Sequence, residues 1–347
     1  MAQLHLVTDE NDETAKLLAP YIQSGNLNFL IGSGASMPAI SIAGDIEKTL
    51  NGLIELEEEV LANSVMAGFI EAITSTYQTL KQGPIVDGPI KATLDNYKSF
   101  VSIIDQILFA RKNEILPRQA SIFSTNYDMF IEFAVKECGN IIMNDGFDRA
   151  SGQPDDFLFA PEQYFDRTYR TSSLYARRVE IPTLNLIKLH GSLNWVRKES
   201  NLVCSAAVVQ PLPEADKADP AKISQYLSQH FLIMPNFKKF HETLMERIYY
   251  DLLRIFSKAM EQENAVLLAF GFSFGDEHIL DITRRALRNP TSQLIIFAYS
   301  HDSIAVFEAK FAKHRNVSVI GPAAGNNLNF QRLNKILGAV LPEMKND

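Results

Sequence analysis

The stretch Asn28-Phe-Leu-Ile-Gly-Ser-Gly-Ala-Ser36 decides the fold. Its first part, Asn28–Ile31, is almost continuously apolar, which is typical of a strand that is buried on both faces of a parallel sheet. The two glycines that follow are typical of a tight turn from a strand into a helix. The stretch therefore predicts a βα unit whose turn lies at the carboxyl end of a buried strand.

Short apolar runs of the same kind recur along the chain, and segments with helical periodicity separate them. Strands that alternate with helices in this way predict right-handed crossovers and a parallel sheet. We therefore predict the α/β class, with a doubly wound, Rossmann-like parallel sheet. The further predicted strands are Ala120–Phe123, Leu184–Leu189, Phe231–Met234, Ala265–Phe270, Leu294–Ala298 and Val317–Ile320.

One segment is too long for a simple crossover. Residues 45–117 separate the first two predicted strands and have helical periodicity throughout, which predicts a helical insertion or subdomain. Residues 145–182 are predicted to be irregular, and the proline-rich residues 211–220 to form an exposed loop. We predict one domain over residues 1–347 that carries the insertion at about 45–117.

Composition excludes several classes of protein. The 347 residues contain 33 Lys and Arg against 41 Asp and Glu, a net charge of −8, which argues against direct nucleic-acid binding. Two cysteines, Cys138 and Cys204, exclude a disulfide framework and a four-cysteine zinc site, and no metal is predicted. The sequence shows no signal peptide and no membrane span, so we predict a cytoplasmic protein.

The first two motifs with chemical potential follow the first two strands. Gly32–Ser36 can bring backbone amides close to a phosphate, or it can be an ordinary strand-to-helix turn. Asn126 and Asp128, in Ser124-Thr-Asn-Tyr-Asp128, can hold a water or a ribose hydroxyl, or they can cap the helix that follows.

The other two motifs follow later strands. His190, in Lys188-Leu-His-Gly-Ser192, suits a general base, since the reference pKa of histidine is about 6.5, or it is structural. In Gly271-Phe-Ser-Phe-Gly-Asp276, the glycine and the serine can face a ribose, while Asp276 can cap the next helix. Whether Tyr127, Lys188 and His278 touch a ligand is left open by the sequence.

In combination and order, the four motifs resemble the sirtuin-like NAD-consuming family. The resemblance extends from about Leu27 to Ile320 and is closest to bacterial sirtuin-like proteins of phage-defence systems. It implies NAD as the substrate, with Asn126 holding the catalytic water and the nicotinamide-ribose side, Asp128 lining the nicotinamide end, and His190 acting as the general base. For the remaining NAD contacts, the resemblance implies Gly32, Ser33, Gly34, Ala35 and Ser36 at the pyrophosphate, and Gly271, Ser273 and Asp276 along the adenosine ribose.

The chain departs from the deacylases of that family. Those enzymes carry a four-cysteine zinc ribbon that forms one wall of the acyl-peptide cleft, and two cysteines cannot build it. The resemblance therefore favours NAD hydrolysis to nicotinamide and ADP-ribose by an antiphage effector that depletes NAD. It also implies restraint by homo-oligomer assembly or by a partner such as a hexameric DNA-translocase-type ATPase. The alternatives are a deacylase or ADP-ribosyltransferase, and a non-catalytic sensor that binds NAD or ADP-ribose.

Overall fold

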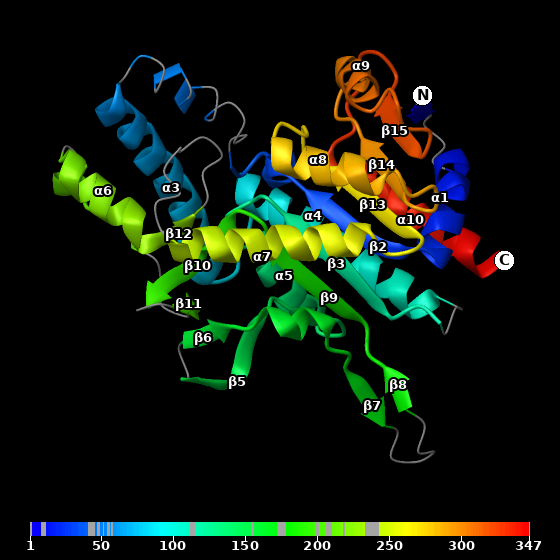
Figure 1. The fold of residues 1–347 in the computed structure, drawn as a ribbon, viewed down its shortest axis with the longest axis horizontal. Coiled ribbons are helices and arrows are strands. Elements are labelled where there is room, and N and C mark those ends of the chain that lie inside the picture. Colours follow the sequence, from blue (N-terminus) through cyan, green and yellow to red (C-terminus); the bar gives the residue numbers. More distant parts are fainter. Residues whose placement is uncertain are drawn as a thin grey trace.

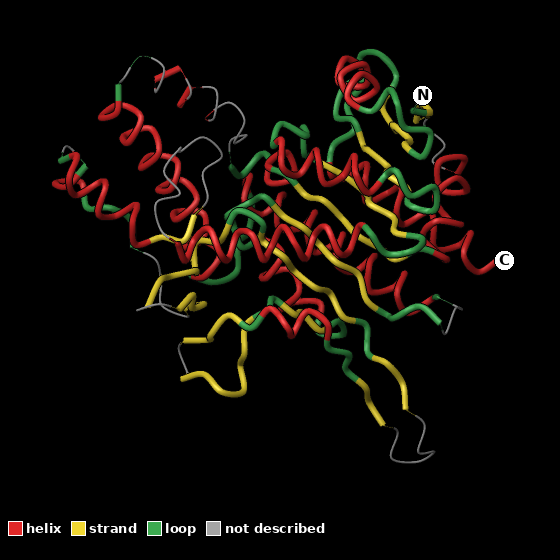
Figure 2. Tube along the Cα trace, in the orientation of Figure 1, coloured by secondary structure: helices red, strands yellow, loops and turns green. Residues whose placement is uncertain are grey.

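A parallel sheet with helices on both faces forms the centre of the molecule (Figures 1 and 2). The α/β fold with a large parallel sheet is as predicted from the strand and helix periodicities. The structure, a computed structural model, describes residues 2–7, 12–40, 46, 49–50, 52–53, 56, 58–111, 115–153, 156–171, 178–198, 201–205, 210–217, 219–232 and 243–346.

Within the described residues, the central sheet has eight strands, all parallel. From β2, the chain adds β3 and β9 on one side, and β13, β14 and β15 on the other. The winding direction thus reverses between β2 and β13, and ligands of such sheets bind at the carboxyl ends of the strands beside this point. The strands lie in the order β1 (Gln3–Val7), β15 (Val317–Pro322), β14 (Gln293–Phe297), β13 (Ala265–Phe270), β2 (Asn26–Ile31), β3 (Gln119–Ser124), β9 (Thr183–Lys188) and β4 (Ile142–Asn144).

Two apolar cores hold helices against the two faces of the sheet, because successive side chains of a strand point to opposite faces. Phe29 and Ile122 belong to one core, whereas Leu30 and Phe123 belong to the other. The first face is covered by α1 (Asp12–Ser24), α4 (Gly88–Ala110), α5 (Phe130–Cys138) and α10 (Phe330–Asn346), and the second by α7 (Thr243–Met260), α8 (Glu277–Ala286) and α9 (His301–Lys310).

The long segment between β2 and β3 contains two helices of 23 residues each. Helix α3 (Glu59–Lys81) packs against α6 (Pro220–Gln229) beside the sheet, whereas α4 packs on β3, α5 and α10. The prediction of continuous helix is wrong at residues 82–87, which connect the two helices. Residues 45, 47–48, 51, 54–55, 57 and 112–114 of the predicted insertion lie outside the described residues. The division into one domain with an insertion stays a prediction.

A second, antiparallel sheet corrects the prediction of irregular structure for residues 145–182, because Phe147–Gln153 and Asp156–Phe159 within this stretch are strands of that sheet. It also corrects the prediction for Phe231–Met234. Residues 231–232 pair with β10 outside the central sheet, and residues 233–234 lie outside the described residues. The second sheet runs β12 (His230–Leu232), β10 (Gly191–Lys198), β11 (Asn201–Ser205), β6 (Asp156–Phe159), β5 (Phe147–Gln153), and a separate hairpin joins β7 (Tyr169–Thr171) to β8 (Arg178–Glu180).

Short 3₁₀ turns complete the description. The predicted loop 211–220 contains one of them, and its last residue, Pro220, begins α6. The turns are η1 (Ser33–Ser36), η2 (Pro161–Phe165) and η3 (Glu214–Asp216).

Candidate functional site

The four motifs lie at the carboxyl ends of four neighbouring strands, in the order β13, β2, β3 and β9. Backbone hydrogen bonds join them: the Thr125 amide donates to the Ile31 carbonyl at 3.1 Å, and the Leu189 amide to the Ser124 carbonyl at 2.8 Å. The structure therefore gathers the motifs at one edge of the sheet, beside the point where the winding reverses.

The glycine turn interlocks with the loop that follows β13. The amides of Gly32 and Gly34 donate to the carbonyls of Phe270 and Gly271, each at 3.0 Å, and the Ala35 amide donates to the Gly32 carbonyl at 3.0 Å. These three amides are thus engaged within the protein. Of the turn, the Ser33 hydroxyl makes no hydrogen bond to the described residues and is half-buried.

The close approach of the two loops requires glycine at position 32. A Cβ there would lie 2.4 Å from the Gly271 carbonyl oxygen and 2.7 Å from the Phe272 Cα, both backbone atoms. We expect Gly32→Ala to lower the free energy of unfolding by about 1–3 kcal/mol, measured by denaturant titration. In Gly275→Ala, the matched control, the new Cβ would meet only the flexible Ser273 hydroxyl, at 3.2 Å, so an equal loss in both variants would contradict the argument.

Asn126 is the centre of a buried hydrogen-bond network. Its Nδ2 donates to the Gly32 carbonyl and to Ser36 Oγ, each at 3.0 Å. Ser36 Oγ donates to Asp128 Oδ2 at 2.6 Å, so the Tyr97 hydroxyl, 3.2 Å from Ser36 Oγ, is the donor in that contact. With both Nδ2 protons engaged, Asn126 Oδ1 is buried and has no partner among the described residues.

Burial governs the acid groups of this network. It raises the pKa of Asp128 above its ordinary value, although the Lys188 ammonium and the Ser36 hydrogen bond act in the opposite direction. Burial also raises the pKa of Tyr97 well above 10, so this phenol keeps its proton. Asp128 Oδ1 accepts from the Phe130 amide at 3.2 Å, which means that Asp128 serves the start of α5 as well as the network.

Two residues of this site were missed in the sequence. Tyr97 of α4 reaches Ser36 and Asn126, and the Phe69 ring of α3 lies edge-on to Tyr127 at 6.1 Å between centroids. Both come from the predicted helical insertion, which therefore contacts the second motif. Helical spacing does not distinguish the two residues from apolar core positions, because their neighbours in space are set by the tertiary fold.

His190 forms a pair with Asp276. His190 is buried and Asp276 is half-buried, and His190 Nε2 lies 3.1 Å from Asp276 Oδ2. Burial raises the pKa of Asp276, but His190, the Ile279 amide and His278 together lower it, and the net pKa lies below the ordinary value. Asp276 Oδ1 accepts from the Ile279 amide at 3.1 Å, so the residue also caps α8. This leaves Nδ1 of His190 without a partner in the described part of the chain.

The remaining candidate residues divide between interior and surface. Lys188 is buried, and its Nζ donates to the Asp128 carbonyl, to Ser192 Oγ at 2.8 Å and to Glu132 Oε1 at 2.7 Å. Ser273 and His278 are exposed, and the structure brings neither side chain into the Asn126 network. Tyr127 packs with its ring centroid 6.4 Å from that of His190.

The cysteines play no part in this site. Cys204 lies in β11 and Cys138 ends α5, and burial raises the pKa of the Cys204 thiol to about 12. Among the described residues, no group of three or more His, Cys, Asp or Glu side chains is placed to hold a metal ion. No described helix has the length and apolar character needed to cross a membrane.

Comparison with known proteins agrees with the motifs. Residues 120–320, more than half of the chain, match the model of the SIR2-like domain family, whose members use NAD as substrate. The matched region contains Asn126, Asp128, His190 and Asp276, while the glycine turn precedes it. A search of curated proteins found no match. The match includes strands β9, β13 and β14 and the polar residues that follow β3, β9 and β13. Because it spans more than half of the chain, the chain belongs to the SIR2-like family.

Proposed function

We propose that this protein is an NAD glycohydrolase, which uses water to cleave the bond between nicotinamide and ribose and releases nicotinamide and ADP-ribose. In this reaction, the oxygen of water bonds to the anomeric carbon of the ribose as the carbon–nitrogen bond breaks. The bonding pair passes to the ring nitrogen of nicotinamide and neutralises its charge. The departing group therefore needs no acid, and the protein has to hold the ribose, place the water and accept one proton.

One observation carries this proposal: the open acceptor Asn126 Oδ1. The Gly32 carbonyl and Ser36 Oγ hold the amide nitrogen, so the oxygen is fixed in orientation and unpartnered among the described residues. A buried acceptor of this kind is stabilised by a donor from outside the protein, such as a water or a ribose hydroxyl. In our proposal, Asn126 orients the attacking water, and His190 takes up its proton at Nδ1 while Asp276 holds the ring.

The test is conversion of NAD by the purified protein, with the products identified by mass spectrometry. We expect free nicotinamide and ADP-ribose, and we expect Asn126→Ala to lower the rate about a hundredfold at unchanged folding, as for loss of one preorganised polar contact. Acyl-ADP-ribose or a modified protein would instead indicate a deacylase or a transferase. Tight NAD binding without turnover would indicate a sensor, and full activity of Asn126→Ala would refute the assigned role.

We further propose that the activity serves antiphage defence by depleting NAD, under restraint at rest. The support is the resemblance of the ordered motifs to sirtuin-like proteins of phage-defence systems, together with the toxicity that unrestrained loss of NAD implies. In this proposal, the restraint comes from homo-oligomer assembly or from a partner such as a hexameric DNA-translocase-type ATPase. NAD conversion measured with and without lysate from infected cells tests it, and equal rates in both would contradict it.

A further inference from the structure

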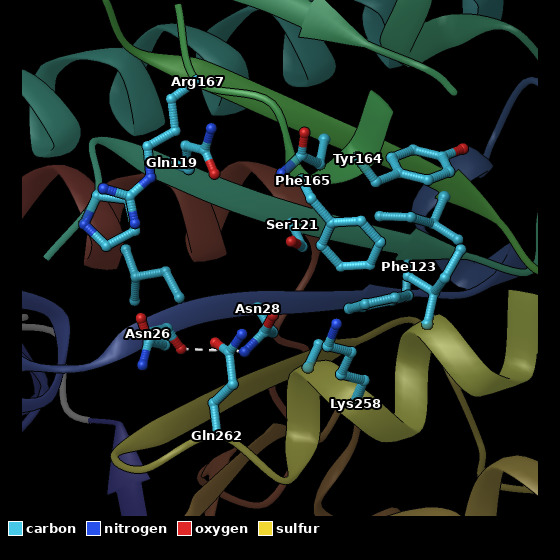
Figure 3. Close-up of a pocket in the computed structure, with 16 residues that line it drawn as sticks. Asn26, Asn28, Gln119, Ser121, Phe123, Tyr164, Phe165, Arg167, Lys258 and Gln262 are labelled. Carbon is cyan, nitrogen blue, oxygen red and sulfur yellow. Dashed lines mark hydrogen bonds between the residues drawn. The ribbon is translucent and has the colours of Figure 1, made fainter. Parts of the chain in front are cut away.

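A pocket lies at the edge of the central sheet opposite the candidate site, where β2, β3 and β9 begin (Figure 3). Asn26 and Gln119, the first residues of β2 and β3, line it, whereas the motif residues follow the last residues of the same strands. A strand of six residues spans about 20 Å, so the two sites lie at opposite ends of the strands. The pocket has a volume of about 180 Å³, below the roughly 300–1,000 Å³ typical of sites for larger ligands.

The floor of this pocket is polar where the interior of a sheet is normally apolar. Asn28, Ser121 and Asn185 are in register on three neighbouring strands, so their side chains point to the same face, toward α7. Strands covered on both faces are ordinarily apolar throughout, and the next residue of this row, Leu267 on β13, follows that rule. The polar positions therefore coincide with the pocket.

Asn185 presents an unsatisfied acceptor there. The side chain is buried, and its Oδ1 has no partner among the residues that the structure describes. Its neighbour on β4, Asn144, shows the usual arrangement: Nδ2 donates to the Gln163 carbonyl and Oδ1 accepts from the Gly146 amide at 3.2 Å. Asn28 Nδ2 likewise donates to the Asn26 carbonyl at 3.0 Å. Asn185 thus calls for a hydrogen-bond donor that the described protein does not supply.

Among the described residues that line the pocket, the charged ones are two cations. Lys258 of α7 extends toward the pocket with its Nζ 4.2 Å from the centre of the Phe165 ring, and Arg167 lies on another side (Figure 3). No carboxylate is among the described residues that line it. Phe123, Tyr164 and Phe165 add aromatic wall, so the pocket suits a small, partly apolar anion.

We propose that this pocket binds a small hydroxycarboxylate. The carboxylate meets the cations Lys258 and Arg167, and the hydroxyl donates to Asn185 Oδ1. This ligand has no part in the proposed NAD hydrolysis, and its binding is measurable without NAD.

Calorimetric titration of the full chain tests the proposal with three matched probes. The probe 4-hydroxybenzoate carries both features, benzoate lacks the donor, and 4-hydroxybenzamide lacks the charge. We expect 4-hydroxybenzoate to bind about tenfold more tightly than either of the others. In Asn185→Leu, 4-hydroxybenzoate should lose its advantage over benzoate but keep its advantage over 4-hydroxybenzamide. In Lys258→Met, it should lose its advantage over 4-hydroxybenzamide but keep its advantage over benzoate. Lys313→Met, at an exposed position outside the lining, is the control and should leave both preferences unchanged.

A loss of fold in a variant is distinguished from a loss of binding. Circular dichroism checks the fold of each variant, and Asn185→Ala replaces the leucine variant if that one does not fold. Equal binding of the three probes would overturn the proposal, and so would preferences that persist in the variants. The proposal would also fail if neither 4-hydroxybenzoate nor lactate, a smaller hydroxycarboxylate, showed saturable binding across the millimolar range.

Discussion

Replacement of His190 by alanine is expected to slow NAD hydrolysis by about 10²–10⁴-fold, the usual contribution of a positioned general base. His190 is 5% exposed, and Asp276 holds its Nε2, so the ring is fixed in orientation before any substrate binds. Without the imidazole, the attacking water has no acceptor for its proton at this position. The measurement is the initial rate of nicotinamide release, with thermal unfolding of the variant recorded in parallel.

Two further variants make this result specific. His278→Ala removes an exposed histidine on the neighbouring helix and should leave the rate unchanged. Asp276→Asn keeps an amino acid that caps helices well, so α8 should persist while the carboxylate that orients His190 is lost. A reduced rate in Asp276→Asn at unchanged stability would support the pair, whereas an unchanged rate in His190→Ala would remove His190 from the mechanism.

Lys188→Met is expected to lower the free energy of unfolding by about 3–5 kcal/mol, because it leaves a buried charge without its partner. The ammonium is almost fully enclosed and pairs with Glu132 at 2.7 Å, while it also donates to the Asp128 carbonyl and to Ser192. Burial raises the pKa of Glu132, and Lys188 is the charge that opposes this rise. Denaturant titration at neutral pH measures the loss.

The control for Lys188 is an ion pair of the same type at the surface. Lys98 of α4 contacts Glu137 of α5, whose side chain is 53% exposed, so Lys98→Met should cost at most about 1 kcal/mol. The double variant Lys188→Met with Glu132→Leu should recover part of the stability, since the unpaired Glu132 carboxylate is then absent while Asp128 still lacks the Lys188 charge. A cost for Lys188→Met no larger than that for Lys98→Met would show that the buried pair does not stabilise the fold.

The central sheet could be predicted from sequence because its strands are buried on both faces. Runs such as Ala265–Phe270 are apolar at every position, and this pattern depends only on burial, whatever strand lies next to it. The antiparallel sheet has no such pattern. Phe147–Gln153 is mostly polar, and β11 pairs with β6 more than forty residues earlier in the chain, so its strands are specified by tertiary contacts.

The site was predictable where a motif follows a predicted strand, and it was not where a helix supplies the side chain. Asn126 and His190 were identified in this way, and their catalytic roles stay predictions. Tyr97 lies inside the apolar stripe of α4, and no pattern in the sequence separates it from Phe100, which is pure core. The engagement of the Gly32 and Gly34 amides by residues 270 and 271 was also invisible, because it depends on the pairing of β2 with β13.

The pairing of β2 with β13 also sets the order in which parts of the fold can form during synthesis. Asn26 Nδ2, at the start of β2, donates to the Glu263 carbonyl, 237 residues further along the chain. A ribosome releases residues from the amino end, so the glycine turn stays unsupported until the segment around Ala265–Gly271 has emerged and docked beside it. Asp276, the partner of His190, emerges after that segment. Under the proposed function, chains whose translation stops earlier are therefore expected to consume no NAD.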